Sequence, residues 1–198
     1  FLHQDDPRPQ IIFQLSFPTF GWRYTPRKKR LALSLLMYIV GGGPGSRLSQ
    51  RLRERDALVY RIGAATVSYS WMGDFLIEGS VGEINLFRSL KALKEELSRL
   101  LKGGIEGEEL SLAKKYGNSQ TSMQFDNPEG VARFIGQQAL RGEEIWFPER
   151  YLKEVDKISA DEVISIAKEV FDFNRTNVSL LGKIDSSTIK KIEELFRK

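Results

Sequence analysis

The chain has 198 residues, a length that suits one domain, and its 41% hydrophobic and 28% charged residues are an ordinary globular composition. It has no cysteine, which excludes disulfides, thiolate metal sites and cysteine nucleophiles but does not fix the compartment. The net charge of +4 comes from 30 basic and 26 acidic residues that are interspersed, so we expect no nucleic-acid partner. No apolar run approaches the roughly 20 residues that cross a bilayer, and we expect no membrane partner.

The first half of the chain predicts a short polar entry followed by alternating strands and helices. Residues 1–10 contain two prolines and are interpreted as a linker or lead-in to a single α+β domain over residues 11–198. The expected elements are a strand over Ile11–Phe17, a loop over Pro18–Pro26, a buried helix over Leu31–Val40, a helix over Pro44–Arg55, and a hairpin of strands Val59–Tyr69 and Asp74–Val81.

The second half is mainly helical. Six leucines at helical spacing mark an amphipathic helix, and Ser159–Glu162 is a capping-box pattern. The expected elements are helices over Leu86–Leu101, Glu108–Phe125, Pro128–Leu140, Pro148–Ile158 and from Ser159 to near Phe171, a strand over Thr176–Leu181, and a helix over Ser187–Phe196. Because the strands pair mostly as hairpins, we expect an α+β fold with a mixed, mainly antiparallel sheet and helices packed on one face.

The sequence does not support a complete metal site. Zinc requires three or four histidine, cysteine or carboxylate ligands at defined spacing. His3 is the single histidine, there is no HxxEH or HxxxH pair, and we interpret His3 as a solvated terminal residue. The predicted metal ligands of this chain are therefore none.

The glycine-rich stretch Gly41–Gly45 precedes a helix and has two interpretations. Its backbone N–H groups could cradle a phosphate, or it could be a tight turn between two helices. It follows a predicted helix rather than a strand and lacks the Lys-Ser/Thr of a P-loop, which favours the turn. Ser46 and Ser49 have no nearby histidine to act as a base, so a serine nucleophile is not indicated.

Arg53 and Tyr60 are the candidate substrate-binding residues, seven positions apart at the end of this helix and the start of the next strand. Both can donate a hydrogen bond to one carbonyl oxygen and stabilise charge that develops on it. The alternative is structural: Arg53 pairs with Glu54 or Asp56, and Tyr60 is half-buried in the sheet. Residue pattern alone leaves both open.

The run Gly45–Tyr60, G-S-R-L-x-x-x-L-R-E-x-x-x-L-x-Y, resembles the C-terminal, non-zinc half-domain of the inverzincin zinc peptidases. This family includes pitrilysin, insulysin and the mitochondrial processing peptidase. Gly73–Phe75, the Gly103–Leu110 step and Ser159–Glu162 follow in the family's order, so the resemblance covers about residues 10 to 183. The sequence departs from the pattern at Ala57, where a glycine is usual; alanine is tolerable there unless the backbone needs a positive φ.

The resemblance implies a peptidase built from two homologous α+β units that face each other across a chamber. A partner unit with the HxxEH motif supplies zinc and the general base, while Arg53 and Tyr60 hold a peptide or unfolded protein near the scissile bond. This chain would then contribute to a zinc metalloendopeptidase but be inactive alone, with no cofactor of its own and with dimerisation allowed. The alternative is a non-catalytic structural or assembly subunit, as in respiratory-complex core proteins. A cytoplasmic location is favoured over a secreted one.

Two further expectations concern the surroundings of this pair. Arg47, Arg51 and Arg55 either line the chamber and favour acidic or C-terminal groups, or form a solvated helix face, which is the preferred interpretation. One strand of the expected hairpin, Val59–Tyr69 or Asp74–Val81, is also a candidate edge to which a peptide adds as an extra strand.

Overall fold

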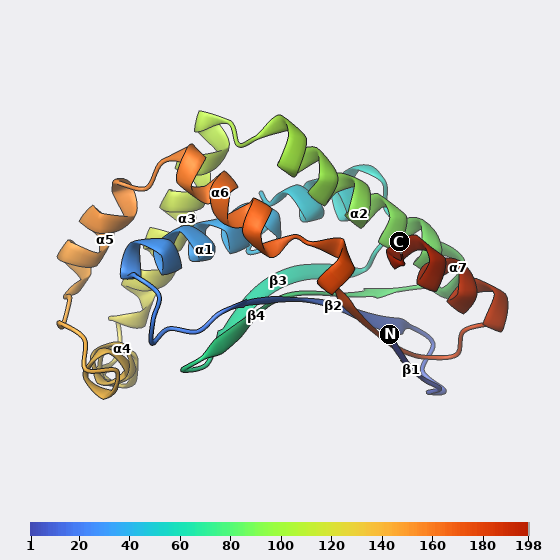
Figure 1. The fold of residues 1–198 in the computed structure, drawn as a ribbon, viewed down its shortest axis with the longest axis horizontal. Helices are drawn as coiled ribbons and strands as arrows, with labels where there is room; N and C mark the ends of the chain where they lie inside the picture. Colours follow the sequence, from blue (N-terminus) through green and yellow to red (C-terminus); the bar gives the residue numbers. More distant parts are fainter. Residues whose placement is uncertain (198) are drawn as a thin grey trace.

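The computed structural model describes residues 1–197 as one sheet with helices on one of its faces (Figure 1). The strands are β1 (Leu2–Gln4), β2 (Ile11–Phe20), β3 (Arg61–Ser68), β4 (Met72–Val81) and β5 (Asn177–Leu181). Their order across the sheet is β1-β5-β2-β4-β3; β1 and β5 are parallel and the other neighbours antiparallel. The expected α+β fold, the mainly antiparallel sheet and the β3–β4 hairpin are confirmed.

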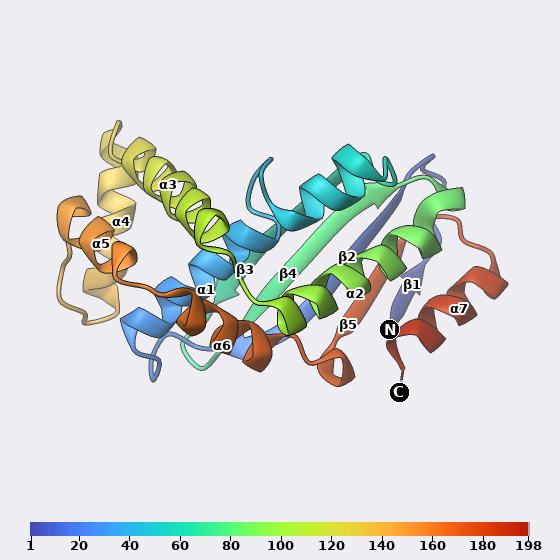
Figure 2. The ribbon, with the colours of Figure 1, turned by 90° about the horizontal axis from the view of Figure 1, so that it is seen from above.

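The helices form a layer above the sheet and extend past one end of it (Figure 2). The helices α1, α2 and α6 lie over the strands, while α3, α4 and α5 gather beyond the end where α1 begins. Their bounds are α1 (Arg27–Val40), α2 (Leu86–Gly103), α3 (Gly107–Gln124), α4 (Pro128–Leu140), α5 (Pro148–Asp156), α6 (Ala160–Val170) and α7 (Ser186–Phe196), with short helical turns at Ser49–Arg55, Glu83–Asn85 and Phe173–Arg175.

The core lies between the sheet and this helical layer. Alternate residues of β2 and β4 are buried because successive side chains of a strand point to opposite faces. Phe13, Leu15 and Phe17 are fully buried, and the Phe17 and Phe75 rings both meet Phe171 edge-on at 5.1 Å between centroids. The intervening residues of both strands, such as Ile12 and Glu78, face the uncovered side of the sheet.

β2 continues past its expected end, to Phe20, and includes Pro18. The expected loop over Pro18–Pro26 is therefore wrong for its first three residues. Pro18 lies opposite Asp74 of β4, whereas the pairing of β2 with β5 ends at Ser16. One side of β2 is unpaired at Pro18, and a residue without an N–H is tolerated there.

The polar entry to the domain contributes a strand of its own. Leu2–Gln4 pairs with Ser179–Leu181, so this part of the lead-in belongs to the sheet. His3 Nε2 lies 2.9 Å from the carbonyl oxygen of Gly182, and its side chain is only 18% exposed. The expectation of a solvated terminal histidine is wrong, because β1 pairs with β5 and this pairing brings His3 to the carbonyl of Gly182, just after β5.

α1 starts four residues before its expected position, at a cluster of basic residues. The expected start at Leu31 came from the apolar run, and positive charges at a helix N-terminus are unfavourable unless they are paired. Each has an acidic partner that is distant in sequence: Arg27 and Arg30 contact Glu143, Lys28 contacts Glu162, and Lys29 contacts Glu169. Arg27 and Arg30 are less than one-fifth exposed, so this start of the helix is only partly solvated.

β3 forms one edge of the sheet, and β4 does not. Because β4 lies between β2 and β3, it has no free side for an added peptide strand. At the centre of β3, the Ala64 N–H donates to the carbonyl oxygen of Gly41 at 3.0 Å. A peptide paired along the whole of β3 would have to displace the Gly41 loop.

Candidate functional site

Arg53 lies on a short helix with a widened, π-helical turn over Ser49–Arg55. The helix begins at Arg47, three residues after the expected start, because Gly41–Ser46 forms turns. The widened turn has the i to i−5 hydrogen bond of a π-helix: the Asp56 N–H donates to the Arg51 carbonyl at 2.9 Å. Leu48 and Leu52 are fully buried, as the i, i+4 spacing predicts.

Two arginines fasten this helix to its neighbours. Arg47 donates to both carboxylate oxygens of Glu109 in α3, at 2.5 and 2.7 Å, and to the Gly104 carbonyl at 2.9 Å. The hydrogen bond to Glu109 raises the pKa of Arg47.

Arg51 makes the corresponding contact with α2. It donates to Glu95 at 2.7 Å and to the buried Glu96 at 3.1 Å. The side chains of Arg47 and Arg51 are 18% and 12% exposed, so the expected solvated helix face is wrong for both. Neither is free to line a chamber, because Arg47 is bound to an acidic residue of α3 and Arg51 to two of α2. Arg55, 61% exposed and paired with Asp56, does fit a solvated face.

Arg53 and Tyr60 are both exposed. The Arg53 side chain is 57% exposed, and its ion pair is with Glu54, at a long Nε to Oε1 distance of 3.8 Å. Tyr60 is 65% exposed, immediately before β3, and its backbone N–H donates to the Ser80 carbonyl at 2.9 Å. The structural alternative is supported for Arg53, which contacts Glu54. Its second part, that Tyr60 is half-buried, is wrong. Among residues 1–197, neither the Arg53 guanidinium nor the Tyr60 hydroxyl has a short hydrogen bond to the protein.

Ala57, between the helix and β3, has a φ of 46°. It is the only non-glycine residue with positive φ in the described part of the chain. The left-handed region costs an L-residue roughly 1–2 kcal/mol, and glycine avoids this cost. The turn before Tyr60 therefore has the backbone conformation that glycine favours, and glycine is the residue that the resemblance leads one to expect at this position.

The glycine-rich stretch packs closely against its neighbours. A Cβ on Gly41 would lie 2.7 Å from the Ala64 nitrogen, and one on Gly43 would lie 3.0 Å from the Tyr116 ring. These contacts account for the glycines as turn and packing residues, the interpretation that the sequence favoured. Ser46 and Ser49 are buried. His3 lies on β1, where it contacts the carbonyl oxygen of Gly182.

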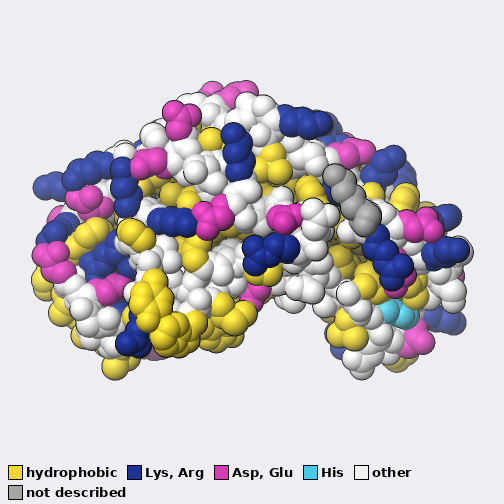
Figure 3. Space-filling model, viewed as in Figure 1, with side chains coloured by type: hydrophobic (Ala, Val, Ile, Leu, Met, Phe, Trp, Pro, Cys, Tyr) yellow, Lys and Arg dark blue, Asp and Glu magenta, His cyan; other side chains and the backbone are white. Residues whose placement is uncertain are grey.

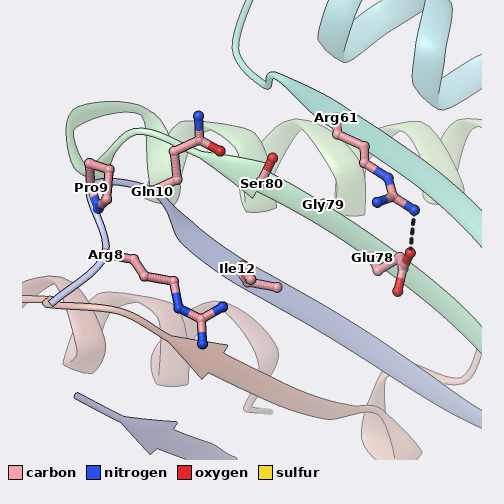
Figure 4. A pocket seen from close by; sticks show the side chains of 8 residues that line it. All are labelled: Arg8, Pro9, Gln10, Ile12, Arg61, Glu78, Gly79 and Ser80. Carbon is pink, nitrogen blue, oxygen red and sulfur yellow. Dashed lines mark hydrogen bonds and ion pairs between the residues drawn. The ribbon is translucent and has the colours of Figure 1, made fainter. Parts of the chain in front are cut away.

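The uncovered face of the sheet carries a pocket that the sequence analysis did not identify. It is lined by Arg8, Pro9, Gln10, Ile12, Arg61, Glu78, Gly79 and Ser80 (Figure 4). The alternation of β4 already placed Glu78 and Ser80 together on this face, and the alternation of β3 would have added Arg61. Nothing in the sequence signalled that residues 8–10 fold over the same place.

Two properties concern the described residues as a set. Within residues 1–197, no cluster of three or more His, Cys, Asp or Glu side chains is placed to hold a metal ion. None of the helices in this range is both long and apolar enough to cross a membrane.

The proteins similar to this chain include a zinc protease and a subunit of a processing peptidase. An uncharacterized zinc protease of Rickettsia felis is 28% identical over 93% of this chain, and subunit alpha-2 of the mitochondrial-processing peptidase of Dictyostelium discoideum is 23% identical over 82%. The chain spans 43% and 38% of the lengths of these two proteins. A crystal structure of a peptidase M16 inactive domain from Pseudomonas fluorescens has the same fold, with a TM-score of 0.81, 19% identity, and coverage of 93% of this chain and 43% of that one.

A family model described as the peptidase M16 inactive domain matches residues 1–116. This is more than half of the described chain. The zinc-protease relatives and the shared fold agree with the match. The chain therefore belongs to the peptidase M16 inactive-domain family, the non-zinc half of zinc-protease-like proteins.

Proposed function

We propose that this chain is the substrate-binding half of a zinc metallopeptidase and that Arg53 and Tyr60 hold the carbonyl of the scissile peptide bond. The observation that carries the proposal is that both donors are exposed: Arg53 on a helix that Arg47 and Arg51 fix in place, and Tyr60 directly before β3. Arg47 and Arg51 of the same helix are committed to Glu109, Glu95 and Glu96, whereas Arg53 is left open to solvent.

The donor groups fit this role chemically. The Arg53 guanidinium and the Tyr60 hydroxyl each donate a hydrogen bond to a carbonyl oxygen. When a nucleophile attacks the carbonyl carbon, negative charge develops on that oxygen, and fixed donors stabilise it without reorganisation. Rigid placement matters, and the ion pairs of Arg47 and Arg51 provide it for the helix that carries Arg53.

The zinc ion belongs to a partner unit in this proposal. The described residues do not fit a zinc site, because His3 is the single histidine and is engaged with Gly182. A homologous unit with an HxxEH motif, fused or separate, would supply the metal-activated water and the general base. The substrate would be a peptide or an unfolded protein segment in the space between the two units.

Peptide cleavage by the chain together with its HxxEH-bearing partner tests the proposal. We expect Arg53→Ala and Tyr60→Phe each to lower kcat/KM on the order of a hundredfold, because each removes one donor to the developing oxyanion. Both side chains are exposed, so the urea unfolding free energy of each variant should change by no more than about 0.5 kcal/mol.

Arg55→Ala is the matched control. Arg55 lies on the same helix, is similarly exposed and pairs with an adjacent acid, yet has no part in the proposed contact. Full activity of an Arg53→Ala/Tyr60→Phe double variant would refute the assigned role. If the wild-type pair cleaves no peptide, a structural or assembly subunit is the better description.

A further inference from the structure

Arg8 and Arg61 face one pocket on the uncovered side of the sheet. The pocket has a volume of about 460 Å³, and Ile12 lies between the two arginines (Figure 4). The sheet forms the underside of an arched molecule, and the space-filling view shows that this underside is hollowed (Figures 1 and 3). A ligand in the hollow would therefore meet the pocket from the uncovered side.

Both guanidinium groups keep most of their hydrogen-bonding capacity. Arg61 Nη2 donates to Glu78 at 3.1 Å, and Arg8 Nε donates to Asp6 at 2.8 Å. Among residues 1–197, no other side chain or carbonyl group accepts from either guanidinium. The side chains of Arg61 and Arg8 are 76% and 55% exposed, so their remaining N–H donors are open to a ligand.

The lining of the pocket carries a net charge of +1, and the free N–H donors of its arginines suit an anionic ligand. Its lining carries two arginines and one acid, Glu78, and Asp6 outside the lining neutralises Arg8 in part. A planar guanidinium matches a carboxylate well because its parallel N–H groups reach both oxygens. Ile12, 38% exposed, offers an apolar surface to the carbon stem that carries such a group.

We propose that this pocket binds a carboxylate of the peptide substrate, either an acidic side chain or the C-terminal carboxyl group. The proposal rests on the peptidase role above, because it places the pocket beside the scissile-bond site. Tyr60 directly precedes Arg61, and its N–H donates to the carbonyl of Ser80, which lines the pocket. The pocket therefore lies next to Tyr60 along the backbone, and in this proposal the bound peptide extends from Tyr60 onto it.

The other arginines near the site do not serve this purpose. Arg47 and Arg51 are mostly buried and bound to acids of α2 and α3. Arg53 is assigned to the scissile carbonyl and Arg55 pairs with Asp56, so the proposal assigns carboxylate preference to Arg8 and Arg61.

A binding assay with three labelled peptides of one backbone sequence tests the pocket. The first has an internal Glu and an amidated C-terminus, the second has Gln there and a free C-terminus, and the third has Gln and an amide. Fluorescence anisotropy is measured with the chain and its HxxEH-bearing partner, in the presence of a chelator that prevents cleavage. We expect the first or second peptide to bind about fivefold more tightly than the third, the scale of partly exposed ion pairs.

The variants separate the two arginines from the surrounding fold. Arg8→Gln and Arg61→Gln should each lower the preference, and the double variant should bring it to about one. Arg133→Gln is the control, because Arg133 is 68% exposed and paired with Glu129 in α4, away from the sheet. The peptide that carries the preference identifies the acidic side chain or the C-terminus as the ligand.

The results also distinguish this proposal from the peptidase role. Equal affinity for all three peptides, or a preference that survives in the double variant, overturns the carboxylate pocket even if Arg53 and Tyr60 support cleavage. A preference that depends on Arg8 and Arg61 upholds the pocket even if the Arg53→Ala/Tyr60→Phe variant cleaves normally, a result that would refute only the carbonyl contact.

Discussion

Arg47 and Glu109 join the helix that carries Arg53 to the start of α3 through two hydrogen bonds of 2.5 and 2.7 Å. The two side chains are 18% and 23% exposed, so water only partly screens this pair. We expect Glu109→Gln to lower the free energy of unfolding by about 1–2 kcal/mol, because it leaves Arg47 without its main counter-charge.

Urea unfolding followed by circular dichroism measures this loss. Glu108→Gln is the control, because Glu108 is also an acid in the first turn of α3 but is exposed and forms no ion pair within residues 1–197. An equal effect of the two substitutions would mean that the interaction with the α3 dipole, and not the pair with Arg47, is responsible.

Ala57 should gain from the residue that its backbone conformation favours. At a φ of 46°, we expect Ala57→Gly to stabilise the protein by about 0.5–1 kcal/mol, since the relief of left-handed strain exceeds the added entropy of the unfolded chain. Ala57→Val should be destabilising, because β-branched residues are strongly disfavoured at positive φ. Thermal unfolding of both variants measures the difference, and a destabilising Ala57→Gly would contradict this backbone conformation.

Gly41 has no room for a side chain. The methyl group of Gly41→Ala would meet the Ala64 nitrogen at 2.7 Å and the Ala64 Cβ at 2.8 Å. We expect a loss of about 1–3 kcal/mol in unfolding free energy and faster amide hydrogen exchange at Ala64. Gly103→Ala is the matched control, because a Cβ there meets nothing within 4 Å. It should be neutral or stabilising by about 0.5–1 kcal/mol.

Asp185 caps α7 and gives a pH dependence of known sign. Hydrogen bonds from the Ser187 hydroxyl and from Thr188 hold the pKa of Asp185 well below its usual value. Its contribution to stability is therefore complete above the unfolded pKa of about 3.9 and disappears as the pH falls through the folded pKa. The difference in melting temperature between the wild type and Asp185→Ala should be constant from pH 7 to 5 and shrink below about pH 4.

Asp185→Asn provides the comparison for this effect. It keeps a side-chain oxygen that can accept from the α7 N–H groups but does not titrate. Its advantage over Asp185→Ala should therefore not vary with pH through this residue. If the gap between the wild type and Asp185→Ala also stays constant down to pH 2, the assigned lowering of the Asp185 pKa is wrong.

Local signals predicted much of the fold. Asn127 and Pro128 define the start of α4, which has the expected bounds, and the Asn127 side chain accepts from Gly130 N–H. The Ser159–Glu162 capping box is present in full at the start of α6. Both signals are contained within four residues of sequence, so no distant partner is needed to interpret them.

The features that the sequence did not predict depend on distant partners. β1 exists because β5 lies beside it, and the early start of α1 depends on Glu143, Glu162 and Glu169. At the candidate site, the spacing of Arg53 and Tyr60 suggested a pair, but their exposure and the burial of Arg47 and Arg51 follow from the packing of α2 and α3. Helix periodicity alone places all these arginines on polar faces and cannot separate them.

The contact between Gly41 and Ala64 also bears on the solubility of the protein. An outer strand with a free row of N–H and C=O groups is a template on which further chains can stack into insoluble sheets. The Gly41 carbonyl occupies the middle of that row on β3, so an incoming strand finds its hydrogen-bonding register interrupted. The loop that leads to the Arg53 helix therefore also protects the open edge of the sheet against aggregation.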